Sequence, residues 1–361
     1  MMKILAAMSG GVDSTLAAAL LLEQGHEVAG ATMRLIKGLD EEEFYAGSCC
    51  SLRDVEDAKA ACAMLGIPFQ VFHFEKEFEE WVIEPFVSAY RNGRTPNPCI
   101  ECNRHLKFSF FLQRALELGF DAIATGHYAK VSVDEKTGLR KLSKGADPLK
   151  DQSYVLYMLT QEMLPKINFP LGGMRKEEVR QRAAALGLVN AAKKESQDIC
   201  FVPDGDYGKF ILDYTGKPEA PGDFVDLQGQ VLGTHKGQSH YTIGQRKGLG
   251  LALGEPGYVV SRNMEANTIT IGANEDLMKS SLLAGDFNWI GEPPPAGEVF
   301  PCLAKARYRQ KEVPAKAIRK TDGTVQVTFD NKIRAVTPGQ AVVLYQGDEV
   351  LGGGTILESG F

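Results

Sequence analysis

Cysteine is the residue type whose placement in this sequence most strongly indicates chemistry. Cys99 and Cys102 form a C-x-x-C pair in a proline-stiffened stretch, residues 94–103, and Cys200 lies far along the chain within S-Q-D-I-C-F. Only the thiolate form of cysteine is a nucleophile, so a reactive cysteine needs an electropositive, partly exposed setting. Basic residues flank all three cysteines: Arg94, Arg104, His105, Lys107, Lys193 and Lys194. The pattern favours reactive thiols.

Other roles for these cysteines remain open on spacing alone. A structural zinc site needs four ligands, and the sequence contains no second C-x-x-C pair. Cys200, taken by itself between two apolar neighbours, has the surroundings of a buried packing residue. We expect packing roles for the cysteines whose spacing indicates no chemistry, namely Cys49, Cys50, Cys62 and Cys302.

A second candidate site is the loop Ser9-Gly10-Gly11-Val12-Asp13-Ser14. Paired glycines allow backbone N–H groups to approach an anion, and the amino end of a helix favours negative charge. Asp13 is a candidate ligand for magnesium held against a phosphate. No G-x-x-x-x-G-K-[ST] occurs in the chain, so the loop is not a Walker motif. The alternative is an ordinary strand-to-helix turn capped by Ser or Asp.

The elements around this loop alternate between strand and helix patterns. Apolar runs predict strands at residues 3–8, 26–33, 69–74 and 122–125. Amphipathic patterns predict helices at residues 14–23, 53–65, 107–118 and 175–186, the last within a longer helical pattern over 162–192. This order predicts a parallel sheet covered on both faces. Ligands of such sheets bind beyond the carboxyl ends of the strands, near the switch in strand order.

The pattern changes after about residue 208. Short β-branched runs at 258–261, 268–271, 325–329 and 341–344 lie between turn residues and predict small all-β domains. We therefore expect an α/β domain over residues 1–208, a central β domain over 209–280 and a β-barrel-like domain over 281–361.

Composition narrows the class of protein. The chain has 361 residues, 44% of them hydrophobic, and a net charge of −6, so it can bury a large core. Residues 301–335 carry nine Lys and Arg against three acidic residues, a local excess of +6 that favours nucleic acid as a partner. Seven thinly spread cysteines indicate a reducing compartment. No apolar run reaches the roughly 20 residues of a membrane helix, so we expect a soluble, cytoplasmic protein that does not bind membranes.

Longer motifs add a family resemblance. The loop S-G-G-V-D-S resembles that of the PP-loop ATP pyrophosphatases (a HUP-like fold), which adenylate a carbonyl or carboxylate oxygen and release pyrophosphate. R-T-P-N-P-x-x-x-C-N together with S-Q-D-I-C-F resembles the bacterial tRNA-specific 2-thiouridylases, and the resemblance spans nearly the whole chain. Further matching stretches are residues 124–129, 150–154, 243–249, 307–310 and 338–340.

The resemblance implies ATP-dependent 2-thiolation of the wobble uridine in the anticodon loop of tRNA, with ATP and Mg²⁺ as cofactors and a sulfur-relay or cysteine desulfurase protein as persulfide donor. Cys102 would be the nucleophile, and Cys200 would carry the persulfide. The residues that would hold ATP are Ala7, Met8, Ser9, Gly10, Gly11, Val12, Asp13, Ser14, Met33 and Gly126. Those that would border the target base are Asn97, Pro98 and Cys99. Those that would contact tRNA are His127, Lys150, Asp151, Gln152, Arg307, Tyr308 and Gln340.

One departure from the family pattern opens an alternative for sulfur delivery. Many relatives carry aspartate where this chain has Cys99. Three thiolates, from Cys99, Cys102 and Cys200, could hold a [4Fe-4S] cluster with one iron left open for an extra sulfide.

Two rival functions remain. Another PP-loop ligase would share Ser9–Ser14 but would not need the thiols. A non-catalytic RNA-binding protein with a redox-sensing C-x-x-C would bind tRNA without consuming ATP.

Overall fold

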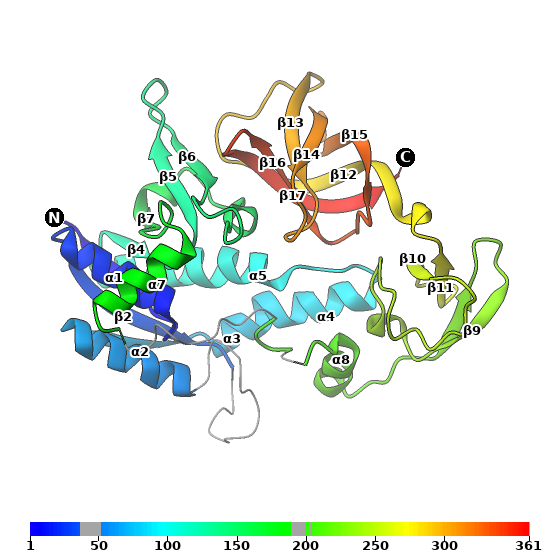
Figure 1. The fold of residues 1–361 in the computed structure, drawn as a ribbon, viewed down its shortest axis with the longest axis horizontal. Coiled ribbons are helices and arrows are strands. Elements are labelled where there is room, and N and C mark those ends of the chain that lie inside the picture. The colour runs from blue at the N-terminus through cyan, green and yellow to red at the C-terminus, as the bar shows by residue number, and fades with distance from the viewer. Residues whose placement is uncertain (37–51, 189–198, 203, 361) are drawn as a thin grey trace.

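The computed structural model describes residues 1–36, 52–188, 199–202 and 204–360 (Figure 1). Five parallel strands form the first sheet, in the order β3-β2-β1-β4-β7. Their bounds are β1 Lys3–Ala7, β2 Glu27–Arg34, β3 Phe69–His73, β4 Ala122–Ala124 and β7 Ile167–Asn168. The sequence predicts the first four strands, whereas β7 is too short to leave an apolar pattern. Strand order reverses between β1 and β4, so the switch point lies beyond their carboxyl ends.

Helices cover both faces of this sheet, as the apolar strands require. Ile4 and Leu5 are neighbours in β1 that point to opposite faces, and neither is exposed to solvent. Ile4 packs in a cluster with α1 and α2, and Leu5 packs in another with Phe108 and Phe111. The main covering helices are α1 Val12–Glu23, α2 Leu52–Leu65, α6 Phe111–Glu117 and α7 Lys176–Ala185. The predicted α/β class is therefore confirmed for this part of the chain.

Two long helical segments contain π-helical stretches. One consists of α5 Pro98–Glu101, the π-helix η2 Cys102–Phe110, and α6; the other consists of α3 Glu75–Phe78, the π-helix η1 Glu79–Ile83, and α4 Glu84–Arg91. The sequence predicts the first of these segments only from residue 107 onward. Pro98 begins it instead, and the Asn97 side chain accepts a hydrogen bond from the N–H of Cys99 at 3.1 Å.

The predicted helical pattern over 162–192 is only partly helical. It contains the 3₁₀ turn η4 Leu164–Lys166, then β7, then α7, and its last residues, from 189, lie outside the described part of the chain. The remaining helical elements are α8 Tyr207–Thr215 and the 3₁₀ turns η3 Ser153–Leu156, η6 Gln238–His240 and η7 Glu275–Leu277. No helix in the described ranges has the length and apolarity needed to cross a bilayer.

Two further sheets follow the α/β domain. The central sheet has the order β10-β11-β8-β9 and packs around Phe224, Val259 and Ile269. Its strands are β8 Gly222–Val225, β9 Val231–His235, β10 Tyr258–Asn263 and β11 Thr268–Gly272. The last sheet closes on itself because β12 pairs with both β15 and β17. Its strands are β12 Met278–Trp289, β13 Val299–Lys305, β14 Val313–Arg319, β15 Val325–Arg334, β16 Ala341–Gln346 and β17 Glu349–Ser359.

A hairpin from the α/β part of the chain also joins the barrel sheet. Its strands are β5 Ala129–Val133 and β6 Arg140–Lys144, and Ser143 of β6 pairs with Glu349 of β17. Lys141 adds an ion pair with Glu349 at 3.1 Å. The hairpin directly follows β4 of the first sheet (Figure 1), and its pairing with β17 adds two strands from the α/β part of the chain to the barrel sheet. The predicted domain bounds stay a prediction.

Candidate functional site

The loop after β1 presents the start of α1 to the switch point. Gly10 has φ +70°, and a Cβ there would lie 2.6 Å from the backbone oxygen of Asp54, so the position requires glycine. The hydroxyls of Ser14 and Thr15 each donate to the Gly11 carbonyl at 3.0 Å. Gly11 is the N-cap of α1 and supplies no side-chain cap. The predicted alternative of a Ser or Asp cap is therefore wrong, and the helix start keeps N–H groups available to an anion.

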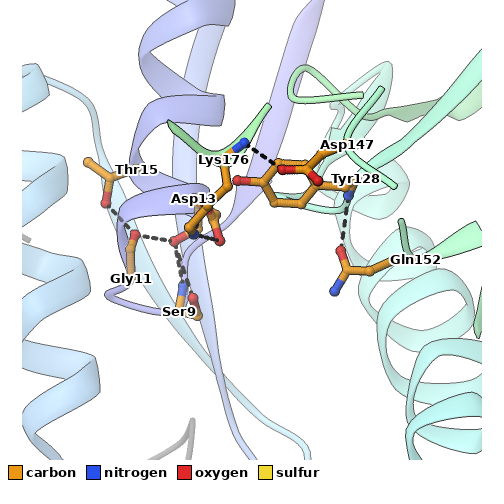
Figure 2. Close-up of polar contacts among 9 residues, drawn as sticks. Ser9, Gly11, Asp13, Thr15, Tyr128, Asp147, Gln152 and Lys176 are labelled. Atoms are coloured by element: carbon orange, nitrogen blue, oxygen red, sulfur yellow. Dashed lines mark hydrogen bonds and ion pairs between the residues drawn. The ribbon is translucent and has the colours of Figure 1, made fainter. Parts of the chain in front are cut away.

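Asp13, in the first turn of α1, already has a cationic partner. The Lys176 ammonium lies 2.7 Å from both Asp13 carboxylate oxygens, and the Tyr128 hydroxyl donates to Asp13 Oδ1 at 2.8 Å (Figure 2). Asp147 accepts the backbone N–H of Lys176 at 2.9 Å and so fixes the start of α7. This arrangement does not leave Asp13 free for a metal, so magnesium binding there stays a prediction and we assign no step to it.

The segment after β4 packs directly against the loop Ser9–Ser14, which we call the nucleotide loop after its predicted ligand. A Cβ on Gly126 would lie 2.9 Å from the Asp13 carbonyl carbon and 3.0 Å from the Ser14 nitrogen, so only glycine allows this approach. The next residue, His127, is buried, and its Nδ1 lies 2.7 Å from Thr125 Oγ1. Burial, with the nearby charge of Lys107, holds the pKa of His127 well below its usual value. The imidazole is therefore neutral at pH 7.

A cavity of about 420 Å³ joins these segments to the thiols. Cys99, Cys102 and Cys200 all line it, together with the nucleotide loop. Other predicted site residues on its wall are Ala7, Met8, Ser9, Gly11, Val12, Asp13, Ser14, Met33, Pro98, Gly126, His127 and Gln152. The structure thus brings together residues from the beginning of the chain, the C-x-x-C segment and the region of Cys200.

The two thiols with predicted catalytic roles come from unrelated elements. Cys102 begins η2, and Cys200 lies in the short described segment 199–202, where Phe201 is buried against Phe78 and Phe86. Cys200 itself is only partly buried, and this agrees poorly with a pure packing role. Cys102 is also partly buried, Cys99 is exposed, and none of the three forms a disulfide with another described cysteine. Lys193 and Lys194 lie outside the described residues.

The loop before Cys99 is tied to both β domains. Arg262 of β10 donates to Thr95 Oγ1 at 3.2 Å, and Gln340 donates to the carbonyls of Thr95 at 2.8 Å and Pro96 at 3.3 Å. The N–H of Thr95 donates to the Pro338 carbonyl at 2.9 Å. We call these contacts the loop clamp. They hold the residues that lead to Asn97, which does not itself line the cavity.

The other predicted tRNA residues lie away from the cavity wall, and their roles stay predictions. The Asp151 carboxylate accepts hydrogen bonds from the backbone N–H groups of Gly145 and Ser153 at 3.1 Å each. The Lys150 backbone N–H donates to the Asp147 carbonyl. Arg307 is largely buried and donates to the Ile243 carbonyl, whereas Tyr308 is exposed. Gln152, on the wall, accepts the N–H of Tyr128 at 3.0 Å (Figure 2).

The remaining cysteines that the structure describes are buried. Burial raises the pKa of the Cys62 thiol to about 11 and that of Cys302 to about 12, so both are protonated and unreactive at pH 7. Cys49 and Cys50 lie outside the described residues.

The described residues contain no cluster of side chains arranged as metal ligands. No three His, Cys, Asp or Glu side chains in these ranges are arranged to hold one ion. His235 and His240, which are five residues apart, do not complete a zinc site, because the His235 ring bonds to Asn267 and Gly237 while His240 pairs with Asp206 at 3.5 Å. The three-cysteine cluster therefore stays a prediction.

Sequence reasoning missed the importance of Lys107, Tyr128, Lys176 and Arg262. Tyr128 lies in a matched motif but has no role assigned from it, and Lys107 is noted only as a basic neighbour of the thiols. Lys176 and Arg262 act on residues more than 150 positions away, and a single sequence carries no signal for such pairings.

Comparisons with known proteins cover almost the entire chain. Three family models match in succession: a tRNA methyl transferase HUP domain at residues 2–204, a tRNA methyl transferase PRC-barrel domain at 208–273 and an aminomethyltransferase β-barrel domain at 279–356. A tRNA-specific 2-thiouridylase of Carboxydothermus hydrogenoformans is 51% identical over 360 residues, which cover 98% of this chain and 97% of that protein. Another, of Acetivibrio thermocellus, is 50% identical over 355 residues, 98% of this chain and 99% of that protein.

Among solved structures, a 4-thiouridine synthetase in complex with RNA and bound ATP matches at 18% identity with a TM-score of 0.38. The match covers 56% of this chain and 45% of that one. This likeness is too distant to support an argument about function.

Proposed function

Because the chain belongs to the family of tRNA-specific 2-thiouridylases, a group of tRNA sulfurtransferases, we propose that it uses ATP to replace the 2-oxygen of the wobble uridine of tRNA with sulfur. The observation that carries this proposal is one cavity lined by both an uncapped helix start and two partly buried thiols. Two of the matching family models carry the description tRNA methyl transferase, and methyl transfer is a different reaction from sulfur transfer. A thiol pair beside a nucleotide loop favours sulfur transfer.

The first step activates the uridine. The C2 carbonyl has no leaving group, so its oxygen must be converted into one. In the proposed step the uridine O2 attacks the α-phosphorus of ATP, an O–P bond forms, and pyrophosphate leaves. The N–H groups at the start of α1, beside Gly11, offset negative charge on the phosphates. Neutral His127 can donate or accept one hydrogen bond there without adding charge.

The second step transfers sulfur. The terminal sulfur of a persulfide on Cys200 attacks C2, a C–S bond forms, and the C2–O bond breaks as AMP leaves with the former uridine oxygen. The Cys102 thiolate then attacks the Cys200 sulfur. The bond between this sulfur and the sulfur attached to C2 breaks, and 2-thiouridine is released. The enzyme is left with a Cys102–Cys200 disulfide, which a thiol reductant must reopen. Alternatively, Cys102 first releases the persulfide sulfur as sulfide, which then attacks C2.

The substrate must present a base outside its stack. Pro98 and Cys99, which follow the clamped Thr95–Pro96 backbone, line the cavity. In the proposed reaction the uridine enters this cavity after leaving its stack. Single-stranded loops release bases at low cost, which favours the anticodon loop over duplex RNA. Sulfur would arrive from a relay or desulfurase protein that carries a persulfide.

An iron–sulfur route is the second candidate for sulfur delivery. Cys99, Cys102 and Cys200 line the same cavity, but no three such side chains among the described residues are arranged around one ion, so this route ranks below the persulfide route. Iron content and activity after anaerobic purification separate the routes. The persulfide route predicts full activity in a colourless preparation, whereas the cluster route predicts that activity follows bound iron. Cys99→Asp removes one thiolate, so the cluster route also predicts loss of iron and thiolation together, while the persulfide route predicts measurable thiolation.

The testing experiment is mass spectrometry of nucleosides from unmodified tRNA incubated with the protein, ATP, magnesium and sulfide. We expect 2-thiouridine that requires ATP. With a persulfide donor in place of sulfide, Cys102→Ser and Cys200→Ser should each lose product, while Cys302→Ala, a buried thiol of the barrel, serves as the matched control. Absence of 2-thiouridine from folded, tRNA-binding wild-type protein, with and without iron–sulfur reconstitution, contradicts the proposal.

A further inference from the structure

We propose that Lys107 is a further catalytic residue, which donates a hydrogen bond to the phosphate that links AMP to the uridine oxygen. The inference rests on the function proposed above and deepens it. It starts from the cavity wall, where Lys107 is the one Lys or Arg among the lining residues of the described chain.

The helical register places Lys107 on the same side as Cys102. In an α-helix a residue five positions along is rotated by about 140°, so the two side chains would diverge. Residues 102–110 instead form the π-helix η2, in which hydrogen bonds join residues five apart and residue 107 lies about one turn above residue 102. Both residues accordingly line the cavity. π-Helical turns are frequent at functional sites, and this one aligns a thiol with an ammonium group.

The ammonium group of Lys107 also lies near the nucleotide loop. Its charge acts on the buried imidazole of His127, which directly follows Gly126. Gly126 in turn packs against the backbone of Asp13 and Ser14 at the start of α1. Lys107 therefore lines the same cavity as the Ser9–Ser14 loop and Cys102, and we place the phosphate of the adenylated uridine in this cavity.

Lys107 is not engaged by an acidic partner among the described residues, unlike the other lysine of this region. Lys176 pairs with both oxygens of Asp13, so that cation and that carboxylate neutralise each other. Lys107 forms no ion pair within the described ranges, and its side chain is only partly buried. A lysine that lines a cavity of about 420 Å³ without a carboxylate partner is suited to an anionic ligand.

The proposed role needs no proton transfer. Negative charge builds up on the bridging and non-bridging oxygens of the phosphate as pyrophosphate leaves and again as AMP leaves. Lys107 donates to a non-bridging oxygen in both steps, and the bonds that form and break are those given above. A donor placed where charge develops in a partly closed site is worth about 10²–10³ in rate.

The test uses Lys107→Met and Lys107→Arg in the full-length protein. Single-turnover 2-thiouridine formation and tRNA-dependent pyrophosphate release are measured at saturating ATP. We expect both rates to fall about 100-fold or more in Lys107→Met, with the Kd for ATP changed less than about three-fold. Lys107→Arg keeps a cation and should recover at least about ten-fold. Lys59→Met, at an exposed lysine of α2, is the matched control, and thermal unfolding reports folding.

Three outcomes would overturn the proposal. Rates in Lys107→Met within about three-fold of wild type exclude a catalytic role. Normal pyrophosphate release with slow thiolation, together with slower alkylation of Cys102 at pH 7, would assign Lys107 to the thiol rather than to the phosphate. Equal losses in Lys107→Arg and Lys107→Met, with a lowered melting temperature in both, would show a structural role. If wild-type protein forms no 2-thiouridine at all, the proposed function fails instead.

Discussion

Lys176 and Asp13 lie 163 positions apart in the chain, yet their charged groups are 2.7 Å apart at the nucleotide loop. The lysine is nearly buried and the aspartate side chain is 27% exposed. Without its partner, Asp13 would present an unpaired negative charge to the phosphates of ATP. At the scale of single residues, this pair keeps the loop attractive to an anion even though it contains an acid.

Lys176→Met should therefore weaken ATP binding by about ten-fold or more and lower the free energy of unfolding by about 3 kcal/mol, because it leaves a partly buried carboxylate unpaired. Titration calorimetry with ATP and chemical denaturation measure the two effects. In the double variant Asp13→Asn with Lys176→Met, part of both losses should be recovered. Fully additive losses in the double variant would contradict direct coupling of the two residues.

Histidine protonation should make the fold sensitive to mild acid. Burial lowers the pKa of His127, His105, His235 and His240 in the folded chain, so each binds protons less readily than in the unfolded chain, where the value is near 6.5. Stability is then constant above pH 6.5 and falls as the pH drops below it. A histidine that stays neutral contributes about 1.4 kcal/mol of this loss at pH 5.5.

Denaturant unfolding between pH 7.5 and 5.5 checks this dependence. His127→Gln removes the imidazole whose pKa lies well below its usual value and should reduce the loss of stability on acidification by about 1 kcal/mol. An unchanged pH dependence in that variant would show that His127 becomes protonated within the fold.

Segments rather than single residues hold the loop that we propose to border the target base. The Thr95–Pro96 backbone is held by Arg262 from the central sheet and by Gln340 next to the barrel, while the π-helix after Cys102 sets the direction of the cavity side chains. The loop clamp therefore links both β domains to the segment proposed to border the reacting base. The family resemblance predicts that Gln340 contacts tRNA. In the structure its side-chain amide donates hydrogen bonds to the Thr95 and Pro96 carbonyls.

Gln340→Glu tests the loop clamp, because it keeps the side-chain shape but sets a carboxylate against two carbonyl oxygens. We expect kcat to fall about ten-fold or more with little change in the Kd for ATP, since a misplaced base loses much of its rate. Gln228→Glu, at an exposed position of the central domain, is the control. A large rise in the Kd for tRNA with kcat unchanged would instead favour direct RNA contact by Gln340.

At the scale of the whole molecule, charge is segregated rather than uniform. The chain carries −6 overall, whereas the barrel strands β13, β14 and β15 and their connections carry the basic excess. Lys316 of β14 and Lys332 of β15 are exposed. Exposed cations on the barrel suit contact with RNA phosphates, which release counterions on binding.

The double variant Lys316→Ala with Lys332→Ala should weaken tRNA binding equally for different tRNA sequences and lower the salt dependence of binding. Each lost phosphate contact reduces the slope of log K against log salt by about 1. Filter binding at several salt concentrations measures the slope, and Lys59→Ala is the control. An unchanged slope would place the RNA on another surface.

Much of the architecture follows from the sequence because local patterns determine it. Apolar runs predicted β1 to β4, and the β-branched run at residues 325–329 between turn residues predicted part of the barrel strand β15. β7, the π-helices and the hairpin β5–β6 escaped prediction, since a two-residue strand, a change of helical period and a long-range strand pairing leave no local signal. The thiols and the nucleotide loop were predicted from motifs, whereas Lys176 depends on tertiary packing alone.

The transfer of the uridine oxygen to AMP tests the account most directly. An anticodon stem-loop carrying [2-¹⁸O]uridine at the wobble position would be incubated with the protein, ATP, magnesium and sulfide, and the AMP analysed by mass spectrometry. Adenylation of O2 predicts one ¹⁸O in AMP for each 2-thiouridine formed, and none in pyrophosphate. Appearance of the label in water or in pyrophosphate, with AMP unlabelled, would contradict activation of the uridine oxygen by ATP.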